Sequence, residues 1–182
     1  MTTYISILRG INVSGQKLIK MDNLRRLYES LGLRSVTTYL QSGNVIFQGD
    51  ILEKDELAQS ITRQIKKELD FDVPVIVLTI DHLKQIIDCN PFSKHSDKDT
   101  TSLYVTFLSS KPQEYEISTI GEKKLSGEEI AFSDNAVYIY CPNGYGKTKL
   151  TNSFLEKKLN TVATTRNWNT TNELLKIAQQ HL

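Results

Sequence analysis

One feature restricts the fold of this 182-residue chain more than any other. It is the order in which strand-like and helix-like hydrophobic patterns alternate along the first 80 residues. Short segments rich in β-branched, aromatic and leucine residues are typical of strands. The sequence predicts four such strands, at residues 3–9, 35–40, 44–48 and 73–78. Because Pro74 has no amide hydrogen to donate to a neighbouring strand, the fourth strand is expected at a sheet edge.

Two segments between these strands have the spacing of amphipathic helices. Leu24, Leu27 and Leu31 recur at helical intervals, and Gly32 follows them as a helix terminator. A second apolar stripe extends over residues 57–69. The resulting order, βαββαβ, predicts a ferredoxin-like split βαβ unit with an antiparallel sheet.

The remaining residues predict a second, smaller half. Its expected elements are strands at 102–108, 129–132 and 136–141, a weak helix at 112–120, and helices near 149–159 and 171–181. This βαββα order has no apolar strand to complete it, and it suggests a degenerate duplication of the first half. The predicted fold class is therefore α+β, with a ferredoxin-like subdomain at 1–80, a helix and polar linker at 81–100, and a second βαββα-type subdomain at 101–182.

Composition restricts the class of protein. With 39% hydrophobic and 24% charged residues, the chain is expected to bury an ordinary core. Its two cysteines, Cys89 and Cys141, are far apart and lack CxxC spacing, which favours free thiols in a reducing compartment. We find no cationic, apolar leader and no apolar run of about 18 residues. The sequence therefore predicts a cytoplasmic protein without a membrane partner.

The net charge of +1 conceals an uneven distribution. Residues 1–50 contain six basic and three acidic residues, and residues 151–182 contain four basic and two acidic residues. The two segments between them are net acidic. If the basic ends meet in space, their field favours an anionic ligand, whereas a merely solvated surface is the alternative.

The segment GINVSGQKLIK, residues 10–20, connects the first strand to the first helix and is the first candidate site. Glycines allow close approach of backbone N–H groups to an anion, and basic side chains supply charge. The candidate ligand-binding residues are Arg9, Gly10, Asn12, Gly15, Lys17 and Lys20. The segment is not a Walker A motif, because a glutamine separates the glycine from the lysine. A wide connection with glycines at its turns is the structural alternative.

Two further loops combine glycine with polar side chains. The hairpin turn in YLQSGNVIF presents Gln41, Ser42 and Asn44, although most hairpin turns have a similar composition. The segment CPNGYGKTKL offers Lys147 after two glycines, but it lacks the first glycine of a phosphate-binding loop. A plain Asn-Gly turn is the alternative for this second segment.

The segment TRNWNT, residues 165–170, precedes the last predicted helix. Thr170 and Glu173 have the T-x-x-E spacing of a capping box, so Thr170 is the predicted helix N-cap. A cap does not require the four residues before it, Arg166, Asn167, Trp168 and Asn169. Near a helix N-terminus their guanidinium, amide and indole groups are candidates for binding an anion, whereas a lone tryptophan is more often a buried anchor.

These segments also carry a family resemblance. The motifs LRGINVSGQKLIKMDNLR, TYLQSGNVIF, NPF and ATTRNWNT follow in order, and over essentially its whole length the chain resembles the bacterial family known as domain of unknown function 1697. One departure is Ser14, where the family pattern has a second glycine after GINV. The resemblance implies a bacterial protein and marks these loops as shared segments. It implies no reaction, substrate or cofactor, and so no catalytic residues.

The sequence contains no recognisable metal site or nucleophile. The three histidines are scattered, and no serine or cysteine stands in a nucleophile elbow. We therefore expect no metal and no cofactor, and we name no catalytic residue.

Three hypotheses about function remain. The first is a module that binds an anionic, phosphate-bearing ligand, either a nucleotide or a nucleic acid, through the basic glycine and asparagine loops. The second is an enzyme that acts on a small phosphorylated or acyl substrate and uses amides as oxyanion donors, although no base is evident. The third is a non-catalytic interaction protein whose polar loops are structural, which buried and mutually bonded asparagines would favour.

Overall fold

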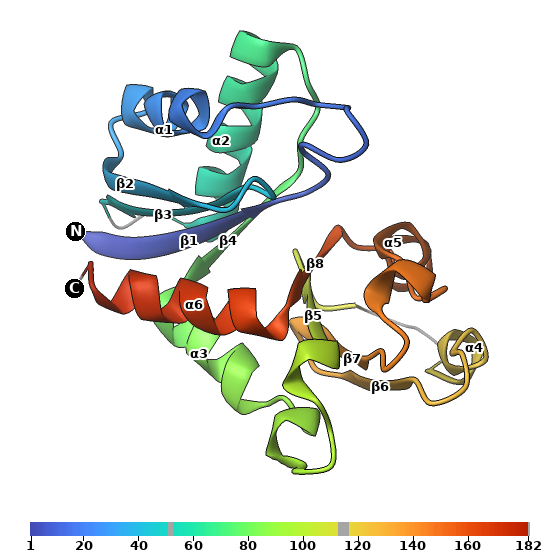
Figure 1. The fold of residues 1–182 in the computed structure, drawn as a ribbon. Helices are drawn as coiled ribbons and strands as arrows, with labels where there is room; N and C mark the ends of the chain where they lie inside the picture. The colour runs from blue at the N-terminus through green and yellow to red at the C-terminus, as the bar shows by residue number, and fades with distance from the viewer. Residues whose placement is uncertain (51–52, 113–116, 182) are drawn as a thin grey trace. The chain divides into compact units, whose positions relative to one another are not determined.

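The computed structural model describes residues 1–50, 53–112 and 117–181 (Figure 1). The chain divides into two compact units, one formed by Met1–Lys84 with Glu173–Leu182 and the other by Gln85–Asn172. Each unit contains one four-stranded antiparallel sheet and its own hydrophobic core. Within the described ranges, no helix has both the length and the apolar character needed to cross a membrane.

The first unit has the βαββαβ order predicted from the sequence. Its elements are β1 (Thr2–Leu8), α1 (Met21–Ser30), β2 (Arg34–Tyr39), β3 (Asn44–Gly49), α2 (Lys54–Leu69) and β4 (Val75–Thr79), after which α3 (Ile80–Asp88) begins. The strands lie in the order β2-β3-β1-β4, and every pair is antiparallel. The fourth strand therefore lies at a sheet edge, as Pro74 predicts.

Both faces of this sheet are buried. Tyr4, Leu8 and Phe47 point to the face that packs against apolar residues of α1 and α2. The alternate residues of β1, such as Ile5 and Ile7, are also fully buried. A strand that is buried on both faces reads as a nearly continuous apolar run, which is why the sequence predicts β1 so clearly.

The C-terminal residues belong to the first unit because they bond to the second face of its sheet. The backbone oxygen of His181 accepts hydrogen bonds from Thr3 Oγ1 at 3.1 Å and from Gln48 Nε2 at 2.6 Å. These two donors are register partners on β1 and β3. The sequence places residues 173–182 in the second subdomain, whereas they group with the first unit.

The second unit repeats the topology of the first. Its described elements are η1 (Phe92–Lys94), η2 (Thr100–Ser102), β5 (Leu103–Leu108), α4 (Ile117–Gly121), β6 (Glu129–Phe132), β7 (Ala136–Tyr140), η3 (Tyr145–Lys147), α5 (Asn152–Leu159), β8 (Ala163–Asn167) and the start of α6 (Trp168–Gln179). The predicted helix at 112–120 corresponds in part to α4, and residues 113–116 lie outside the described ranges. The strand order β6-β7-β5-β8 matches β2-β3-β1-β4 position by position.

Strand β8 completes the second sheet, and sequence periodicity missed it. The predicted βαββα order is confirmed, and β8 follows it as a fourth strand that pairs with β5. Four of its five residues, ATTRN, are polar, so no apolar run marks the strand. The hydroxyl of Thr165 bonds to the sheet and to the elements beside it: Thr165 Oγ1 lies 2.7 Å from Thr106 Oγ1 of β5, accepts from Tyr145 Oη of η3 at 3.0 Å, and donates to Asn152 Oδ1 of α5 at 2.6 Å.

A half-buried histidine in the first turn of α3 couples the first unit to pH. His82 Nδ1 lies 3.3 Å from Lys54 Nζ at the start of α2. Burial, and secondarily the positive charge of Lys54, lower the pKa of His82 below its ordinary value. The folded state therefore favours the neutral imidazole.

We expect the stability of the protein to fall as the pH drops below about 6.5, the ordinary pKa of histidine. The pKa of His82 is lower in the folded state than in the unfolded state. The neutral ring therefore contributes fully to the free energy of unfolding at pH values above the unfolded-state pKa, and this contribution is lost as the pH falls through the folded-state pKa. Urea unfolding at pH 7.5 and pH 5.5 measures this loss, and His82→Gln is expected to reduce it. Lys54→Gln should reduce it partly. An identical pH dependence in wild type and His82→Gln would contradict this assignment.

Candidate functional site

The loop between β1 and α1 has an unusual backbone. Positive φ angles occur at Gly10 (72°), Asn12 (54°), Ser14 (50°), Gly15 (75°) and Lys17 (46°). Positive φ is uncommon for residues other than glycine, and three of these five residues have side chains. Strained backbone conformations concentrate at binding and catalytic sites, which makes this loop the first place to look for a ligand.

The side chain of Asn12 fixes the shape of this loop. Its Nδ2 donates to the backbone oxygens of Ile19 at 3.0 Å and Gln41 at 2.8 Å, and its Oδ1 accepts from Ile19 N at 2.8 Å. The backbone N of Asn12 also donates to Lys17 O at 3.2 Å. Asn12 thus joins the loop at 9–20 to the β2–β3 turn, and the structure brings these two predicted segments together.

The β2–β3 turn packs closely against the same loop. Gly43 has a φ of 76°, and a Cβ atom at this position would lie 2.5 Å from Ile11 Cδ1. Asn44 is buried, and its Nδ2 donates to Tyr39 O at 2.8 Å and to Ser42 Oγ at 3.1 Å. Asn44 therefore closes its own hairpin, while Gln41 and Ser42 remain exposed.

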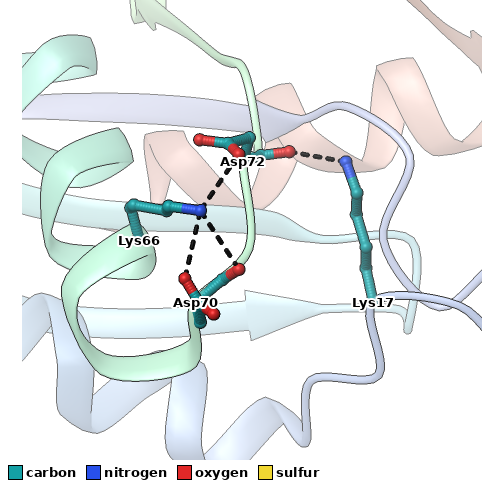
Figure 2. Close-up of polar contacts among 4 residues, drawn as sticks. All are labelled: Lys17, Lys66, Asp70 and Asp72. Carbon is teal, nitrogen blue, oxygen red and sulfur yellow. Dashed lines mark hydrogen bonds and ion pairs between the residues drawn. The ribbon is translucent and has the colours of Figure 1, made fainter.

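Lys17 is anchored to the connection between α2 and β4 (Figure 2). Its Nζ donates to the backbone oxygen of Asp72 at 2.5 Å. On the other side of this connection Lys66 Nζ lies 3.1 Å from Asp70 Oδ1 and 3.1 Å from Asp72 Oδ2, and these hydrogen bonds raise the pKa of Lys66. The carboxylates of Asp70 and Asp72 thus pair with Lys66, whereas Lys17 bonds to a neutral backbone carbonyl.

Backbone donors remain available on the loop. In the described part of the chain, the N–H groups of Gly10, Ser14 and Gly15 have no hydrogen-bond acceptor, and Ser14 and Gly15 are exposed. Lys20 is exposed next to the start of α1, and Arg9 is half-buried at the end of β1. Free N–H groups with nearby cations are the chemical components of an anion site.

Arg166, in the second unit, is buried rather than surface-exposed. The residue is 8% exposed, and its Nη1 donates to Thr164 Oγ1 at 3.0 Å and to Thr165 O at 2.9 Å. Burial lowers the pKa of Arg166 to about 10, so the guanidinium remains charged at neutral pH. Its position on β8 makes it part of the sheet.

Asn167, and not Thr170, caps α6. Asn167 Oδ1 accepts from Thr170 N at 2.7 Å, and α6 begins at Trp168. The prediction that Thr170 is the N-cap is wrong, because the helix begins earlier and Thr170 lies in its first turn. A preceding asparagine is an equally strong cap, so the T-x-x-E spacing was coincidental here. Trp168 is half-buried and Asn169 is exposed.

Lys147 lies in a separate loop of the second unit. It is exposed at the end of η3, and its backbone N donates to Gly144 O at 3.1 Å. The adjacent Tyr145 ring packs on Tyr104 with centroids 4.8 Å apart. In the first unit the candidate residues thus form one group, Arg9 to Lys20 with Gln41 to Asn44. In the second unit they lie in two separate segments, Arg166 to Asn169 and the loop that contains Lys147.

Several polar residues near these segments were not predicted. Lys66, Asp70 and Asp72 neighbour the loop at 9–20, and Tyr145 and Asn152 bond to Thr165. Tyr145 lies within the predicted segment CPNGYGKTKL, but nothing in the sequence distinguishes it. Asp72 and Asn152 are 55 and 13 positions away from their partners Lys17 and Thr165, so only the fold reveals these contacts.

The geometry gives little support for catalysis by a cysteine or for metal binding. Both cysteines are free thiols. Burial, and secondarily the neighbouring Glu128, raise the pKa of Cys141 to about 12, so its thiol is protonated and unsuited to nucleophilic attack. Among the described side chains, no cluster of three or more His, Cys, Asp and Glu groups is arranged to hold a metal ion.

Comparisons with known proteins give a family and a fold. The family model described as "Protein of unknown function (DUF1697)" matches residues 1–138. A search of curated proteins finds no match. Among solved structures, the conserved bacterial protein SP0830 from Streptococcus pneumoniae is similar with a TM-score of 0.72 and 23% identity, covering 97% of this chain and 98% of that chain. At this level of identity the likeness shows the fold alone.

We expect Asn12→Ala to lower the free energy of unfolding by about 1–3 kcal/mol, because three side-chain hydrogen bonds are lost and two backbone carbonyls lose a donor. Urea unfolding measures the change. Asn23→Ala, an exposed asparagine on α1, is the matched control and should change stability by no more than about 0.5 kcal/mol. Equal effects of the two substitutions would show that Asn12 does not hold the loop.

Asn167→Ala is expected to destabilise the protein by about 1 kcal/mol through loss of the α6 cap. Asn167→Asp keeps the acceptor oxygen and should retain most of the stability. Asn169→Ala changes an exposed amide two residues away and serves as the control, with an expected effect within about 0.5 kcal/mol. Thermal or urea unfolding compares the three variants. A larger loss for Asn169→Ala than for Asn167→Ala would contradict the cap assignment.

Proposed function

The chain belongs to the DUF1697 family, and we propose that it is a binding protein for an anionic, phosphate-bearing ligand that the loop at residues 9–20 recognises. The observation that carries this proposal is the run of positive φ angles from Gly10 to Lys17, together with N–H groups that have no acceptor in the described residues. Ser14 and Gly15 form the tip of a tight turn closed by the hydrogen bond from Gln16 N to Val13 O at 2.9 Å, so their N–H groups are exposed and can donate to a phosphate oxygen.

The fixed shape of the loop supports the proposal. The side chain of Asn12 bonds to Ile19 at the end of the loop and to Gln41 in the β2–β3 turn, so the donors are held in place before a ligand arrives. Lys17 is docked on Asp72 and fixes the far side of the loop. A site that is already ordered loses less conformational entropy when the ligand binds. In this interpretation the side chains of Asn12 and Lys17 shape the site, and backbone N–H groups with Lys20 contact the phosphate.

The local charge favours a single phosphate group over a long nucleic acid strand. Lys17 bonds to the connection between α2 and β4, which carries the carboxylates of Asp70 and Asp72 next to Lys66 (Figure 2), so a polyanion that extended past the loop in this direction would meet two carboxylates. Proteins that bind nucleic acid strands present a continuous basic surface, whereas this chain has a net charge of only +1. A mononucleotide or another small phosphate ester is therefore the preferred ligand class.

The candidate residues of the second unit differ in their exposure and in their intramolecular hydrogen bonds. Asn167 is engaged in capping α6, and Arg166 is buried in the sheet. Lys147 and Asn169 are exposed and Trp168 is half-buried, and the proposal for the loop at 9–20 does not depend on any of the three.

A specific observation favours the non-catalytic interaction protein as a second candidate function. Asn12, Asn44 and Asn167 all use their side chains in intramolecular hydrogen bonds, as expected if the polar loops are structural. In addition, Val13 and Leu18 on the loop are 58% and 65% exposed, which suits contact with another protein. The enzyme alternative is weaker, because the segments 9–20 and 40–44 contain no histidine, aspartate or glutamate to act as a base.

Titration with inorganic phosphate, AMP and a single-stranded oligonucleotide, followed by backbone amide NMR shifts, tests the proposal. We expect AMP and phosphate to shift the amides of residues 10–17, and higher salt to weaken both. Lys20→Gln should reduce affinity by about twofold to fivefold. Gly15→Ala should reduce it further, since the left-handed backbone at residue 15 is disfavoured with a side chain although no atom lies within 4 Å of the added Cβ.

Arg26→Gln, an exposed cation further along α1, is the matched control and should leave the affinity unchanged. Amide shifts that exclude the loop, or equal effects of Lys20→Gln and Arg26→Gln, would overturn the proposal. Tighter binding of the oligonucleotide than of AMP would contradict the preference for a small ligand.

A further inference from the structure

A groove beside α2 forms a second candidate site in the first unit. Its volume is about 460 Å³, within the range of small-molecule sites. Leu31 and Leu33, from the connection between α1 and β2, line one side of the groove. The other lining residues come from α2 and are Glu56, Leu57, Gln59, Ser60 and Arg63.

The floor of the groove is apolar and belongs to the core. Leu33 and Leu57 are buried members of the first unit's hydrophobic cluster, and Leu31 packs against that cluster. Near the groove, Gln64 Nε2 donates to Ser30 Oγ at 3.2 Å and joins α2 to the end of α1. The floor is therefore formed in advance, with Leu33 and Leu57 7% and 4% exposed, and an apolar ligand group can pack on this surface without unfolding any element.

The rim of the groove is polar and carries one charge of each sign. Glu56, Gln59, Ser60 and Arg63 follow the i, i+3, i+4, i+7 spacing and so lie on one face of α2. Glu56 and Arg63 are separated by about 10 Å along the helix axis. Across the ranges that the structure describes, none of these four side chains makes a hydrogen bond or an ion pair within the protein.

We propose that this groove binds a small amphipathic carboxylate, with its apolar body on Leu31, Leu33 and Leu57 and its carboxylate on Arg63. A guanidinium group binds a carboxylate through two parallel N–H donors, a geometry that an ammonium group does not offer. Gln59 and Ser60 can donate further hydrogen bonds next to Arg63. The negative charge of Glu56 disfavours the reverse orientation, so it fixes which end of the groove receives the carboxylate.

This site is separate in chemistry from the loop at 9–20. The loop offers backbone N–H groups suited to phosphate, whereas the groove pairs one guanidinium with three leucine side chains. The inference does not depend on phosphate binding, and either one can fail alone.

Octanoate is a suitable probe, because it combines one carboxylate with a flexible apolar chain. Titration followed by amide NMR shifts is expected to perturb Leu31, Leu33, Gln59, Ser60 and Arg63. Arg63→Gln should weaken binding by about fivefold to tenfold, through loss of a charge-assisted hydrogen bond. Glu56→Gln should strengthen it by about twofold, because a repulsive charge is removed.

Lys67→Gln is the matched control, since it removes one positive charge from an exposed position on the same helix outside the groove. It should change the affinity for octanoate by less than about twofold. Octanol tests the carboxylate contact and should bind more weakly than octanoate to the wild type. The proposal is overturned if millimolar octanoate shifts none of the groove amides, if Arg63→Gln and Lys67→Gln act alike, or if octanol binds as tightly as octanoate.

Discussion

The central strand β1 is hydrogen-bonded along both edges and buried on both faces, and the rest of the first unit follows from this constraint. Residues 4–7 of the strand pair with β3 on one side and with β4 on the other. Burial of both faces requires a helical layer on one side and the segment ending at His181 on the other. The chain then leaves β1 into the loop at 9–20, so a strand paired on both sides leads directly into the loop with the positive φ angles.

Most of the fold could be predicted from the sequence, because hydrophobic periodicity reports directly on burial. The order of the first six elements, the edge position of β4 and the family are confirmed. Strand β8 was missed because it satisfies its polar groups through hydroxyl networks, which leave no apolar pattern. The N-cap at Thr170 was wrong because local spacing rules do not determine where a helix begins when two good capping residues stand three positions apart.

The candidate site was predictable only at the level of segments. Glycine and asparagine content correctly indicated that residues 9–20 and 41–44 have unusual backbone, and Asn12 joins the two. The roles of individual side chains were not predictable, since a buried amide that fixes a turn and an exposed amide that binds a ligand look the same in sequence. The anchoring of Lys17 on Asp72 and the groove at Arg63 depend on contacts between residues far apart in the chain. Such contacts leave no mark within a single sequence window.

The polar character of β8 has a consequence for misfolding. This strand forms an edge of its sheet, where unpaired backbone groups invite pairing with other chains. A slip of one residue along β5 would turn Thr165 away from Thr106 and place the Arg166 guanidinium against the aliphatic core. The hydroxyl pair of Thr106 and Thr165 and the buried cation thus penalise a shift by one residue. The polar residues that concealed this strand from hydrophobic pattern analysis therefore help to fix its register.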